Sequence, residues 1–414
     1  MAETRIPITA ESLGVAPGLR FCVINHGCKV NKVEADTASS YLAELGAVLA
    51  DEEDAAIVIV NTCTVTGEAD KKARKAVRHA LKVAPNALVI VTGCGASIDA
   101  GGYAGIDERV RVIDRFELLD ALKPKDRSPL RMGKDFRTRV NIKIQDGCDH
   151  ACTYCIVHVA RGRARSADAA QVLAEAEGYF ANGAKELVLA GIDLGSYRSG
   201  TVGLAGLVGS LVESARRQCE PGGIPARVRA SSLEPMTIDD AFIDLLAQSE
   251  GSVCRHLHVP LQSGSTKVLR EMARPYSADE FLRLVEKLYV RVPSLSLTTD
   301  IIVGFPGETD DDFACTLELA QACRFSKIHV FPYSKRAGTP AAKRTDQVDP
   351  LIVKERAARL RKLSDELRED DYRKRIGTSE LVLVESKSAL TESYHEIPLP
   401  AGAEEGSLLP VVLG

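Results

Sequence analysis

The stretch Gln145-Asp-Gly-Cys-Asp-His-Ala-Cys-Thr-Tyr-Cys155 places three cysteines in one loop with C-x3-C-x2-C spacing. Three thiolates on so short a loop can surround one metal centre. A structural zinc site usually closes with four protein ligands, and a cysteine-held iron–sulfur cluster usually has four as well. The trio Cys148, Cys152 and Cys155 therefore indicates a cluster with one iron left open for a ligand that takes part in the chemistry.

The composition sets the broad class of the protein. The chain has 414 residues, 45% of them hydrophobic, which predicts two or three domains. The net charge of −4 means that a nucleic-acid partner would have to be met by local basic patches. We expect no membrane-spanning segment and no export signal. Eleven cysteines in such a chain predict a reducing cytoplasmic location, with thiols used for metal binding or catalysis.

Residues 1–18 predict a loose N-terminal arm, and residues 19–125 predict an open parallel α/β domain. Strand patterns alternate with helical patterns, and the apolar run at 55–60 is typical of a strand buried on both faces. The expected strands are 19–25, 55–60, 87–91 and 109–113, and the expected helices are 32–45, 68–83 and 115–122.

One cysteine follows each of the first three strands of this domain, namely Cys28, Cys63 and Cys94. The carboxyl ends of parallel strands lie along one edge, where ligands bind, so we expect these cysteines to converge. The functional interpretation is a second three-thiolate cluster with an open position. The alternative is three buried cysteines that act as small apolar residues, which is less consistent with strand-end loops. Cys22 lies inside a strand and is assigned a structural role.

Residues 138–370 predict a central partial (β/α)6 barrel of TIM type, after a charged linker at 126–137. The three-cysteine loop follows the first strand, and chemistry in such barrels occurs at the carboxyl ends of the strands. The expected strands are 140–145, 186–190, 227–231, 256–259, 295–303 and 327–331, and the expected helices are 167–181, 204–219, 238–249, 277–289 and 309–323.

Several strand-end loops of this barrel are rich in glycine and polar residues. They contain Gly191, Ser232, Glu234, Gln262 and Ser263. Glycine lets the backbone approach a ligand, and Glu or Ser can bind ribose hydroxyls and an ammonium group. One such loop alone is more often a turn or a helix cap, but several on one barrel face favour a bound cofactor. We assign structural roles to the remaining cysteines, Cys219, Cys254, Cys315 and Cys323.

Arg161, Arg163 and Arg165 follow the cysteine loop. A charge run of this kind is usually a solvated turn, but its place beside the cluster favours binding of a phosphate or another anionic substrate group. With the basic helix at 68–83 it could form a nucleic-acid footprint.

At the C-terminus, a charged helix at 349–373 precedes a short β module at 375–414, with strands at 380–385, 394–399 and 407–413. That module is marginal as an independent fold, and docking on the barrel would let it order.

These motifs together resemble the radical S-adenosylmethionine methylthiotransferase family over nearly the whole chain. The cysteine loop with Tyr154 is similar to the radical enzyme signature, and the stretches 231–235, 256–264 and 300–308 are family-like barrel segments. The C-terminal module is similar to an abbreviated TRAM domain, an RNA-binding β-barrel. Gly27-Cys-Lys-Val-Asn31 and Ala160-Arg-Gly-Arg-Ala-Arg-Ser166 most resemble the branch that acts on N6-threonylcarbamoyladenosine (t6A) in tRNA.

The resemblance implies a mechanism and a set of site residues. Two [4Fe-4S] clusters are expected, one on Cys148, Cys152 and Cys155 and one on Cys28, Cys63 and Cys94. S-adenosylmethionine would chelate the open iron of the first cluster and yield a radical that takes hydrogen from C2 of the base. The second cluster would deliver sulfur, and a second S-adenosylmethionine would supply the methyl group. Expected cofactor contacts are Tyr154, Gly191, Ser232, Glu234, Gln262 and Ser263, and expected substrate contacts are Arg161, Arg163 and Arg165.

The resemblance therefore implies methylthiolation of t6A at position 37 of tRNA, with an electron donor such as flavodoxin or ferredoxin. The oligomeric state stays open, with a monomer favoured. Within the family, the alternatives are action on isopentenyladenosine in tRNA or on an aspartate of a ribosomal protein. Outside it, the alternatives are an iron–sulfur electron carrier and a zinc-dependent RNA-binding protein, which metal analysis would separate because zinc is colourless and not redox active.

Overall fold

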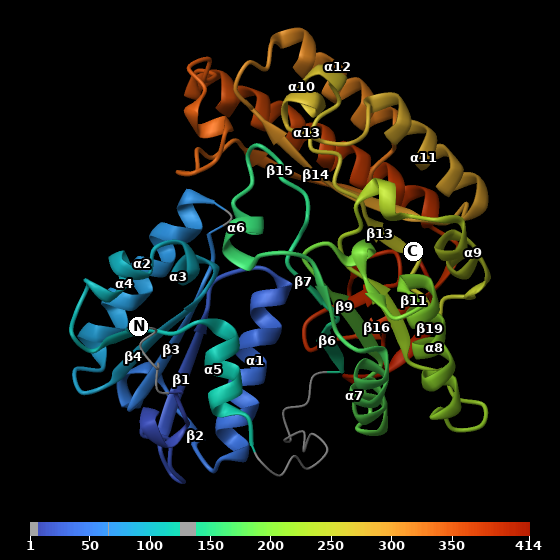
Figure 1. The fold of residues 1–414 in the computed structure, drawn as a ribbon. Helices are drawn as coiled ribbons and strands as arrows, with labels where there is room; N and C mark the ends of the chain where they lie inside the picture. Colours follow the sequence, from blue (N-terminus) through green and yellow to red (C-terminus); the bar gives the residue numbers. More distant parts are fainter. Residues whose placement is uncertain (1–6, 65, 125–137) are drawn as a thin grey trace. The chain divides into compact units, whose positions relative to one another are not determined.

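The computed structural model describes residues 7–64, 66–124 and 138–414, so the predicted linker at 126–137 lies outside the described residues. The chain forms two compact units (Figure 1). The N-terminal unit comprises Met1–Pro129 and also Cys155–Arg163, and the barrel unit comprises Leu130–Tyr154 and Ala164–Gly414. The short segment after Tyr154 thus packs with residues that lie far earlier in the sequence.

The N-terminal unit contains an all-parallel sheet with the strand order β2-β1-β3-β4-β5. The order reverses direction between β1 and β3, which creates a topological switch point at the carboxyl edge of the sheet. The predicted open parallel sheet is therefore confirmed. Its strands are β1 (Arg20–Asn25), β2 (Val48–Leu49), β3 (Ile57–Thr62), β4 (Leu88–Gly93) and β5 (Val110–Val112).

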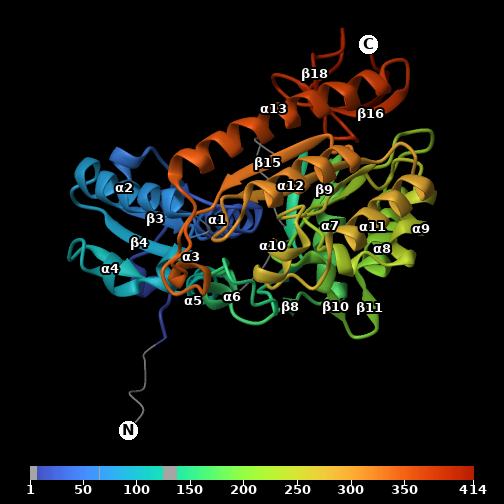
Figure 2. The same cartoon turned by 90° about the horizontal axis from the view of Figure 1, so that it is seen from above.

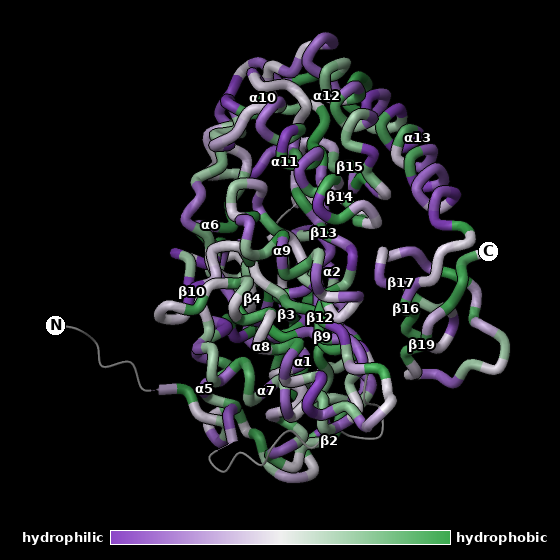
Figure 3. The backbone as a smooth tube through the Cα atoms, turned by 90° about the vertical axis from the view of Figure 1, so that its right-hand side faces the viewer, coloured by the Kyte–Doolittle hydropathy of each residue, from purple (hydrophilic) through white to green (hydrophobic). Residues whose placement is uncertain are grey.

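Helices cover both faces of this sheet, which explains why its central strands are apolar throughout. One face packs against α1 and α5, and the other packs against α2 and α4. Figure 3 shows the apolar character of β3 and β4 in green. The helices are α1 (Lys29–Glu44), α2 (Gly67–Val83), α3 (Cys94–Ile98), α4 (Ala100–Ala104), α5 (Arg115–Leu122) and α6 (Val157–Arg161).

The arm predicted at 1–18 is not loose in its described part. A 3-10 turn, η1 (Glu11–Leu13), places Leu13 in the apolar core beside Phe21 and Leu42. Leu13 is only 5% exposed, and burying one leucine side chain contributes about 1.5–3 kcal/mol. Ile8 and Val15 pack against the same core, so several apolar side chains fix the arm on the domain.

The barrel unit contains an arc of parallel strands in chain order, β6-β9-β12-β13-β14-β15. Continuous ladders join β6, β9 and β12 and also β13, β14 and β15, and a parallel bridge from Ser232 to His258 links the two groups. The predicted partial barrel is confirmed. The strands are β6 (Arg139–Lys143), β9 (Glu186–Ala190), β12 (Arg227–Ala230), β13 (His256–His258), β14 (Ser296–Val303) and β15 (Lys327–Pro332).

Amphipathic helices pack on the outer face of this arc, and Figure 2 shows α13 running beside β15 towards the C-terminal strands. The short helix α10 (Thr266–Glu271) was not predicted, because six residues carry too little periodicity. Among the described helices, none combines the length and apolarity that a bilayer crossing needs. The main helices are α7 (Ala169–Ala181), α8 (Leu204–Arg217), α9 (Asp240–Gln248), α11 (Ala278–Arg291), α12 (Asp310–Ala322) and α13 (Pro350–Arg375).

The C-terminal module is an antiparallel sheet with the order β18-β17-β16-β19. It packs on the barrel strands, as its small size requires. Arg227 donates to the carbonyl of Leu381 over 2.6 Å, and the ring of Tyr394 stacks on His256 with 4.6 Å between centroids. The strands are β16 (Ser379–Val384), β17 (Ala389–Thr391), β18 (Glu396–Ile397) and β19 (Leu408–Val412), of which β17 was not predicted.

Glu186 anchors a buried charge cluster at the contact between barrel and module. Its carboxylate is fully buried and pairs with Arg227, Arg229 and Arg139. Burial alone would raise the pKa of Glu186, but Arg229, Arg227 and Arg139 outweigh that effect and hold the pKa well below its usual range. Arg229 also donates to the carbonyl of Glu392 in the module.

We expect the barrel unit to lose stability in acid. The lowered pKa of Glu186 means that its stabilising contribution is present above the unfolded value of about 4.3 and is lost as the pH falls below it. The free energy of unfolding of the metal-free chain, measured by circular dichroism in urea, should therefore fall between pH 6 and pH 3.5. Glu186→Gln should be less stable at pH 6 and show a shallower fall. A parallel pH profile for both proteins would contradict the assignment.

Candidate functional site

The structure brings Cys28, Cys63 and Cys94 to the same edge of the N-terminal sheet. They follow β1, β3 and β4, which are neighbours, and β1 and β3 flank the switch point. Gly93 allows the turn before Cys94, because it has a φ of 90° and a Cβ there would lie 2.2 Å from Asn61 Oδ1. The convergence predicted from parallel topology is therefore present.

The environments of these cysteines differ. Cys28 is exposed, whereas Cys63 and Cys94 are buried. Burial raises the pKa of Cys94 to about 11, with Arg161 opposing the rise and Cys28 adding to it. The raised pKa means that Cys94 is a neutral thiol in the metal-free protein, and a bound metal would deprotonate it.

A buried polar network lies behind this cysteine edge. Arg161 Nε donates to Cys94 Sγ over 3.0 Å, and its terminal nitrogens donate to Glu34 over 2.9 Å and to Asn31 Oδ1 over 3.2 Å. Cys28 Sγ donates to the same Asn31 oxygen over 3.2 Å. Arg161 reaches the network from α6, which packs against α3.

This network differs from the expectation for Arg161. The sequence predicted contact with an anionic substrate group, but the guanidinium is 2% exposed and its partners are groups of the protein itself. Arg163 and Arg165 are exposed, as a substrate contact requires. Asn31 and Glu34 were not predicted, although two buried polar residues on the face of α1 that packs on the sheet are a detectable signal.

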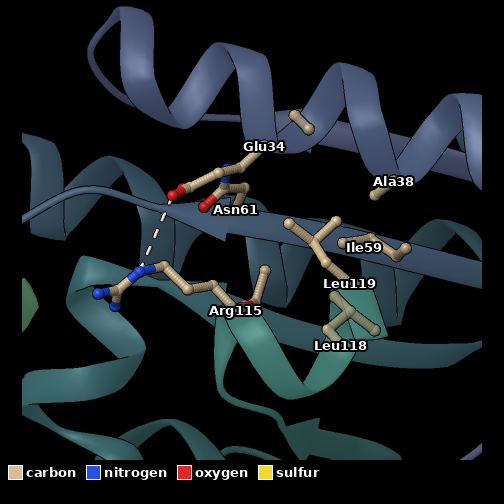
Figure 4. Close-up of a pocket in the computed structure, with 9 residues that line it drawn as sticks. Glu34, Ala38, Ile59, Asn61, Arg115, Leu118 and Leu119 are labelled. Atoms are coloured by element: carbon tan, nitrogen blue, oxygen red, sulfur yellow. Dashed lines mark ion pairs between the residues drawn. The ribbon is translucent and has the colours of Figure 1, made fainter. Parts of the chain in front are cut away.

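Figure 4 shows a small cavity between α1, α5 and the sheet, lined by Glu34, Asn61, Thr92 and Arg115 together with apolar side chains. Its volume of about 10 Å³ is the room of one water molecule. The hydroxyl of Thr92 is buried without a hydrogen-bond partner among the described residues. The cavity is thus suited to a buried water and is too small for a nucleoside or a cofactor.

The cysteine loop of the barrel unit is anchored by hydrogen bonds on both sides. Thr153 donates its backbone N–H to Met272 over 3.1 Å and accepts from the backbone of Ala341 over 2.9 Å. Gln145 donates to the carbonyl of Gly147 over 2.8 Å and accepts from the backbone of Ile192 and Asp193. The loop is therefore held in place by three other segments of the barrel unit before any metal binds.

Cys148 and Cys152 lie within this anchored loop, and Cys155 follows where the chain enters the N-terminal unit. Cys152 is buried, and burial raises the pKa of Cys148 to about 12. Arg274, which was not predicted, donates to Cys152 Sγ over 3.2 Å and to the carboxylate of Glu234. Glu234 and Cys152, predicted from separate motifs, therefore share one buried cation.

The other predicted cofactor contacts occupy neighbouring strand ends. Gly191 follows β9, Ser232 and Glu234 follow β12, and Gln262 bridges to Ile301 of β14. A Cβ on Gly191 would lie 3.1 Å from the Gln145 side chain, so this glycine permits close packing on the loop.

Tyr154 and Ser263 have protein partners. Tyr154 packs with Phe305 and Tyr333 in a small apolar cluster. Ser263 is 1% exposed, and its hydroxyl lies 3.4 Å from that of Thr316. A direct cofactor contact by Ser263 therefore stays a prediction.

Buried polar atoms without partners mark the same barrel face. Among the described residues, Asp193 Oδ1, Ser231 Oγ and Glu308 Oε1 have no hydrogen-bond partner, and they follow β9, β12 and β14. Buried polar groups are normally satisfied, so this set fits a polar ligand. Soft thiolate donors fit an iron–sulfur cluster, and the face as a whole suits a cluster with an amino-acid-bearing nucleoside cofactor.

Comparison with known proteins shows the relationship of the chain. Residues 142–320 match the radical SAM superfamily, and residues 20–113 match an uncharacterized protein family, UPF0004. The threonylcarbamoyladenosine tRNA methylthiotransferase MtaB of Bacillus subtilis (strain 168) is 38% identical over 368 residues, which cover 82% of this chain and 79% of that protein. MtaB of Thermotoga maritima is 36% identical, with coverage of 87% and 85%.

A relative named for a different modified base is also similar. The tRNA-2-methylthio-N(6)-dimethylallyladenosine synthase of Parafrankia sp. (strain EAN1pec) is 36% identical over 397 residues, covering 89% of this chain and 79% of that protein.

Solved structures share the fold. The radical S-adenosylmethionine methyltransferase TsrM from Kitasatospora setae, solved with cobalamin and a [4Fe-4S] cluster, has a TM-score of 0.58 at 16% identity, with coverage of 78% and 77%. OxsB has a TM-score of 0.53 at 10% identity, covering 87% of this chain and 57% of that one. The sequence relatives confirm the resemblance carried by the motifs, and the chain belongs to the radical S-adenosylmethionine tRNA methylthiotransferase family.

Proposed function

We propose that this protein methylthiolates C2 of N6-threonylcarbamoyladenosine at position 37 of tRNA. The observation that carries the proposal is the pair of cysteine trios, because one trio lies on the radical SAM loop and the other converges at the switch point of the N-terminal sheet. The relatives named MtaB support the choice of base. The tRNA is therefore the proposed macromolecular partner, with a flavodoxin or ferredoxin as electron donor.

The residues of the chain divide between two tasks. Cys148, Cys152 and Cys155 would hold a [4Fe-4S] cluster to which S-adenosylmethionine binds, and together these groups supply the one-electron chemistry that activates a carbon–hydrogen bond. Arg274 orients Glu234 and donates to Cys152, so it positions a carboxylate beside a cluster ligand. Such outer hydrogen bonds orient ligands and tune the potential of a metal site.

The second task belongs to the N-terminal unit. Cys28, Cys63 and Cys94 would hold the second [4Fe-4S] cluster, which we assign to sulfur delivery. Arg161 donates to the Cys94 sulfur, so it can orient that thiolate, whereas the bond from the Cys28 thiol to Asn31 Oδ1 positions Cys28 in the metal-free protein. Arg163 and Arg165, which are exposed, stay candidates for contacts with the RNA backbone.

A second candidate substrate is dimethylallyladenosine, because the relative from Parafrankia carries that name at 36% identity. Nucleoside analysis of tRNA decides between the two. In a strain of the source organism that lacks this protein, 2-methylthio-t6A should disappear and t6A should rise by the same amount. Any 2-methylthio-dimethylallyladenosine should be unchanged. Loss of the dimethylallyl product instead, restored by the gene in trans, would assign the other base.

A further inference from the structure

The inner wall of the barrel carries a polar cluster below the cofactor loops. Side chains alternate along β13, β14 and β15. Leu257, Ile301 and Ile328 point outward into the core with the helices. The opposite, inward face presents His256, His258, Thr298, Asp300 and His329. Complete TIM barrels fill this space with branched apolar side chains. A polar lining therefore indicates a role other than packing of the barrel core.

Polar contacts connect His256, Thr298, His258 and Asp300 into one column, and His329 lies beside its upper end. Thr298 Oγ1 lies 3.0 Å from His256 Nε2 and 3.0 Å from His258 Nδ1. His258 Nε2 lies 3.2 Å from Asp300 Oδ1. The rings of His258 and His329 are 5.6 Å apart, and the polar atoms of His258, Asp300 and His329 all lie within 4.8 Å of one another.

The two ends of the column differ in burial. The lower end is closed by the C-terminal module, where Tyr394 stacks on His256, which is 4% exposed. At the upper end the side chains of His258 and Asp300 are 16% and 30% exposed. The upper three residues are therefore accessible from the open face of the barrel, whereas the lower residues are structural.

The upper end is level with the predicted cofactor loops. Leu233 donates its backbone N–H to the carbonyl of His258 over 2.9 Å, next to Ser232 and Glu234. Gln262 donates to the carbonyl of Asp300 over 2.8 Å. A base whose C2 is presented to the cofactor site would thus place its substituents within reach of this wall.

We propose that His258, Asp300 and His329 bind the polar substituent on N6 of the substrate base. The inference rests on the proposed function, because it takes the substituent to be threonylcarbamoyl. That group carries a carboxylate, a hydroxyl and N–H donors. The imidazole of His329 suits the carboxylate, and the Asp300 carboxylate, held by His258, accepts from the hydroxyl or the N–H groups. A dimethylallyl group offers none of these partners, so it would displace water from the wall without returning a hydrogen bond.

The cluster is thereby a specificity determinant rather than part of the radical chemistry. A site built to hydrogen-bond its substrate rejects an analogue that lacks the bonding group much more strongly than an apolar pocket rejects an extra polar group. The wall thus favours t6A, because dimethylallyladenosine would displace water from the polar side chains without returning a hydrogen bond.

The test uses the holoenzyme with both clusters and three anticodon stem-loop RNAs that differ only at position 37, carrying t6A, dimethylallyladenosine or adenosine. His329→Leu should raise the Kd for the t6A RNA about tenfold or more, as expected for loss of a hydrogen bond to a charged group. The Kd for the adenosine RNA should not change. Cleavage of S-adenosylmethionine without RNA should also be unchanged, which shows that the variant is folded.

Three further variants complete the test. His329→Gln retains a donor and should recover most of the t6A affinity. Glu213→Leu, on α8 with a side chain 69% exposed, is the control and should change none of the three affinities. Asp300→Asn should lower the ratio of kcat/KM for t6A RNA over dimethylallyladenosine RNA about tenfold.

Three outcomes would overturn the inference: equal weakening for all three RNAs, no change with t6A RNA, or a loss of t6A preference in the wild type on adding EDTA. The last would mean that a divalent cation, and not the side chains directly, binds the substituent. Failure of the proposed function looks different, because the wild type would then cleave S-adenosylmethionine but form no methylthio product from t6A RNA.

Discussion

Cys63→Ala is expected to abolish formation of 2-methylthio-t6A while S-adenosylmethionine cleavage continues. Cys63 is 5% exposed and follows β3 at the switch point, between the strands that lead to Cys28 and Cys94. Its loss leaves two thiolates for a cluster that already uses three, and the iron content should fall from about eight to about four atoms per chain. The cysteine loop of the barrel unit is anchored by its own hydrogen bonds, so its cluster should persist.

The measurement combines iron counting, 5′-deoxyadenosine formation and nucleoside analysis of product RNA after anaerobic reconstitution. Cys22→Ala is the matched control, since Cys22 lies within β1, packs with apolar residues and should keep both clusters. If Cys63→Ala also stopped cofactor cleavage in a folded protein, the assignment of separate tasks to the two trios would be wrong.

The second large effect is expected for Arg161→Met. The substitution leaves Glu34 buried at 4% exposure without its bidentate cation and removes the donor to Cys94. Breaking a buried ion pair by removing one partner typically costs about 3–5 kcal/mol. The free energy of unfolding of the metal-free chain, measured by circular dichroism in urea, should fall by that amount. The double variant Arg161→Met with Glu34→Leu should regain only part of the loss, because Glu34 is then no longer stranded but the buried Arg115, 3.8 Å from Glu34, loses its carboxylate partner.

Arg163→Met provides a matched control two residues away. Its side chain is exposed, and exposed substitutions usually change stability by less than about 0.5 kcal/mol. Equal and small effects of the two substitutions would show that Arg161 does not hold the network together.

The contrast between these arginines shows what the sequence can and cannot predict. Strand β9 has the bounds predicted for it, 186–190, because its last four residues are an apolar run of the kind found in buried parallel strands and the run ends at Gly191. The convergence of Cys28, Cys63 and Cys94 also follows from the sequence, because parallel topology places successive strand ends at one edge. In both cases the relevant information is local or topological.

The partners of Arg161, by contrast, depend on residues that are distant in the chain. Arg161 and Arg163 look alike in sequence, and only the position of Glu34, 127 residues earlier, makes one buried and the other exposed. Arg274 was missed for the same reason, since nothing near it in sequence points to Cys152, 122 residues earlier. Whether a charged side chain is buried depends on the residue that it pairs with. Ion pairs between residues so far apart in the chain leave no periodic pattern in the sequence.

Residues Cys155–Arg163 belong to the N-terminal unit. This affects which segments can be exchanged between relatives and which residues change together in evolution. A chimera that exchanges residues 1–129 for those of a relative would pair a foreign Glu34 and Cys94 with the native Arg161. The exchangeable module is therefore discontinuous, and a graft must carry 155–163 with it. Positions 31, 34 and 161 should accordingly co-vary among relatives. Asn31 and Glu34 lie in the first domain of the linear sequence, whereas Arg161 lies in the second.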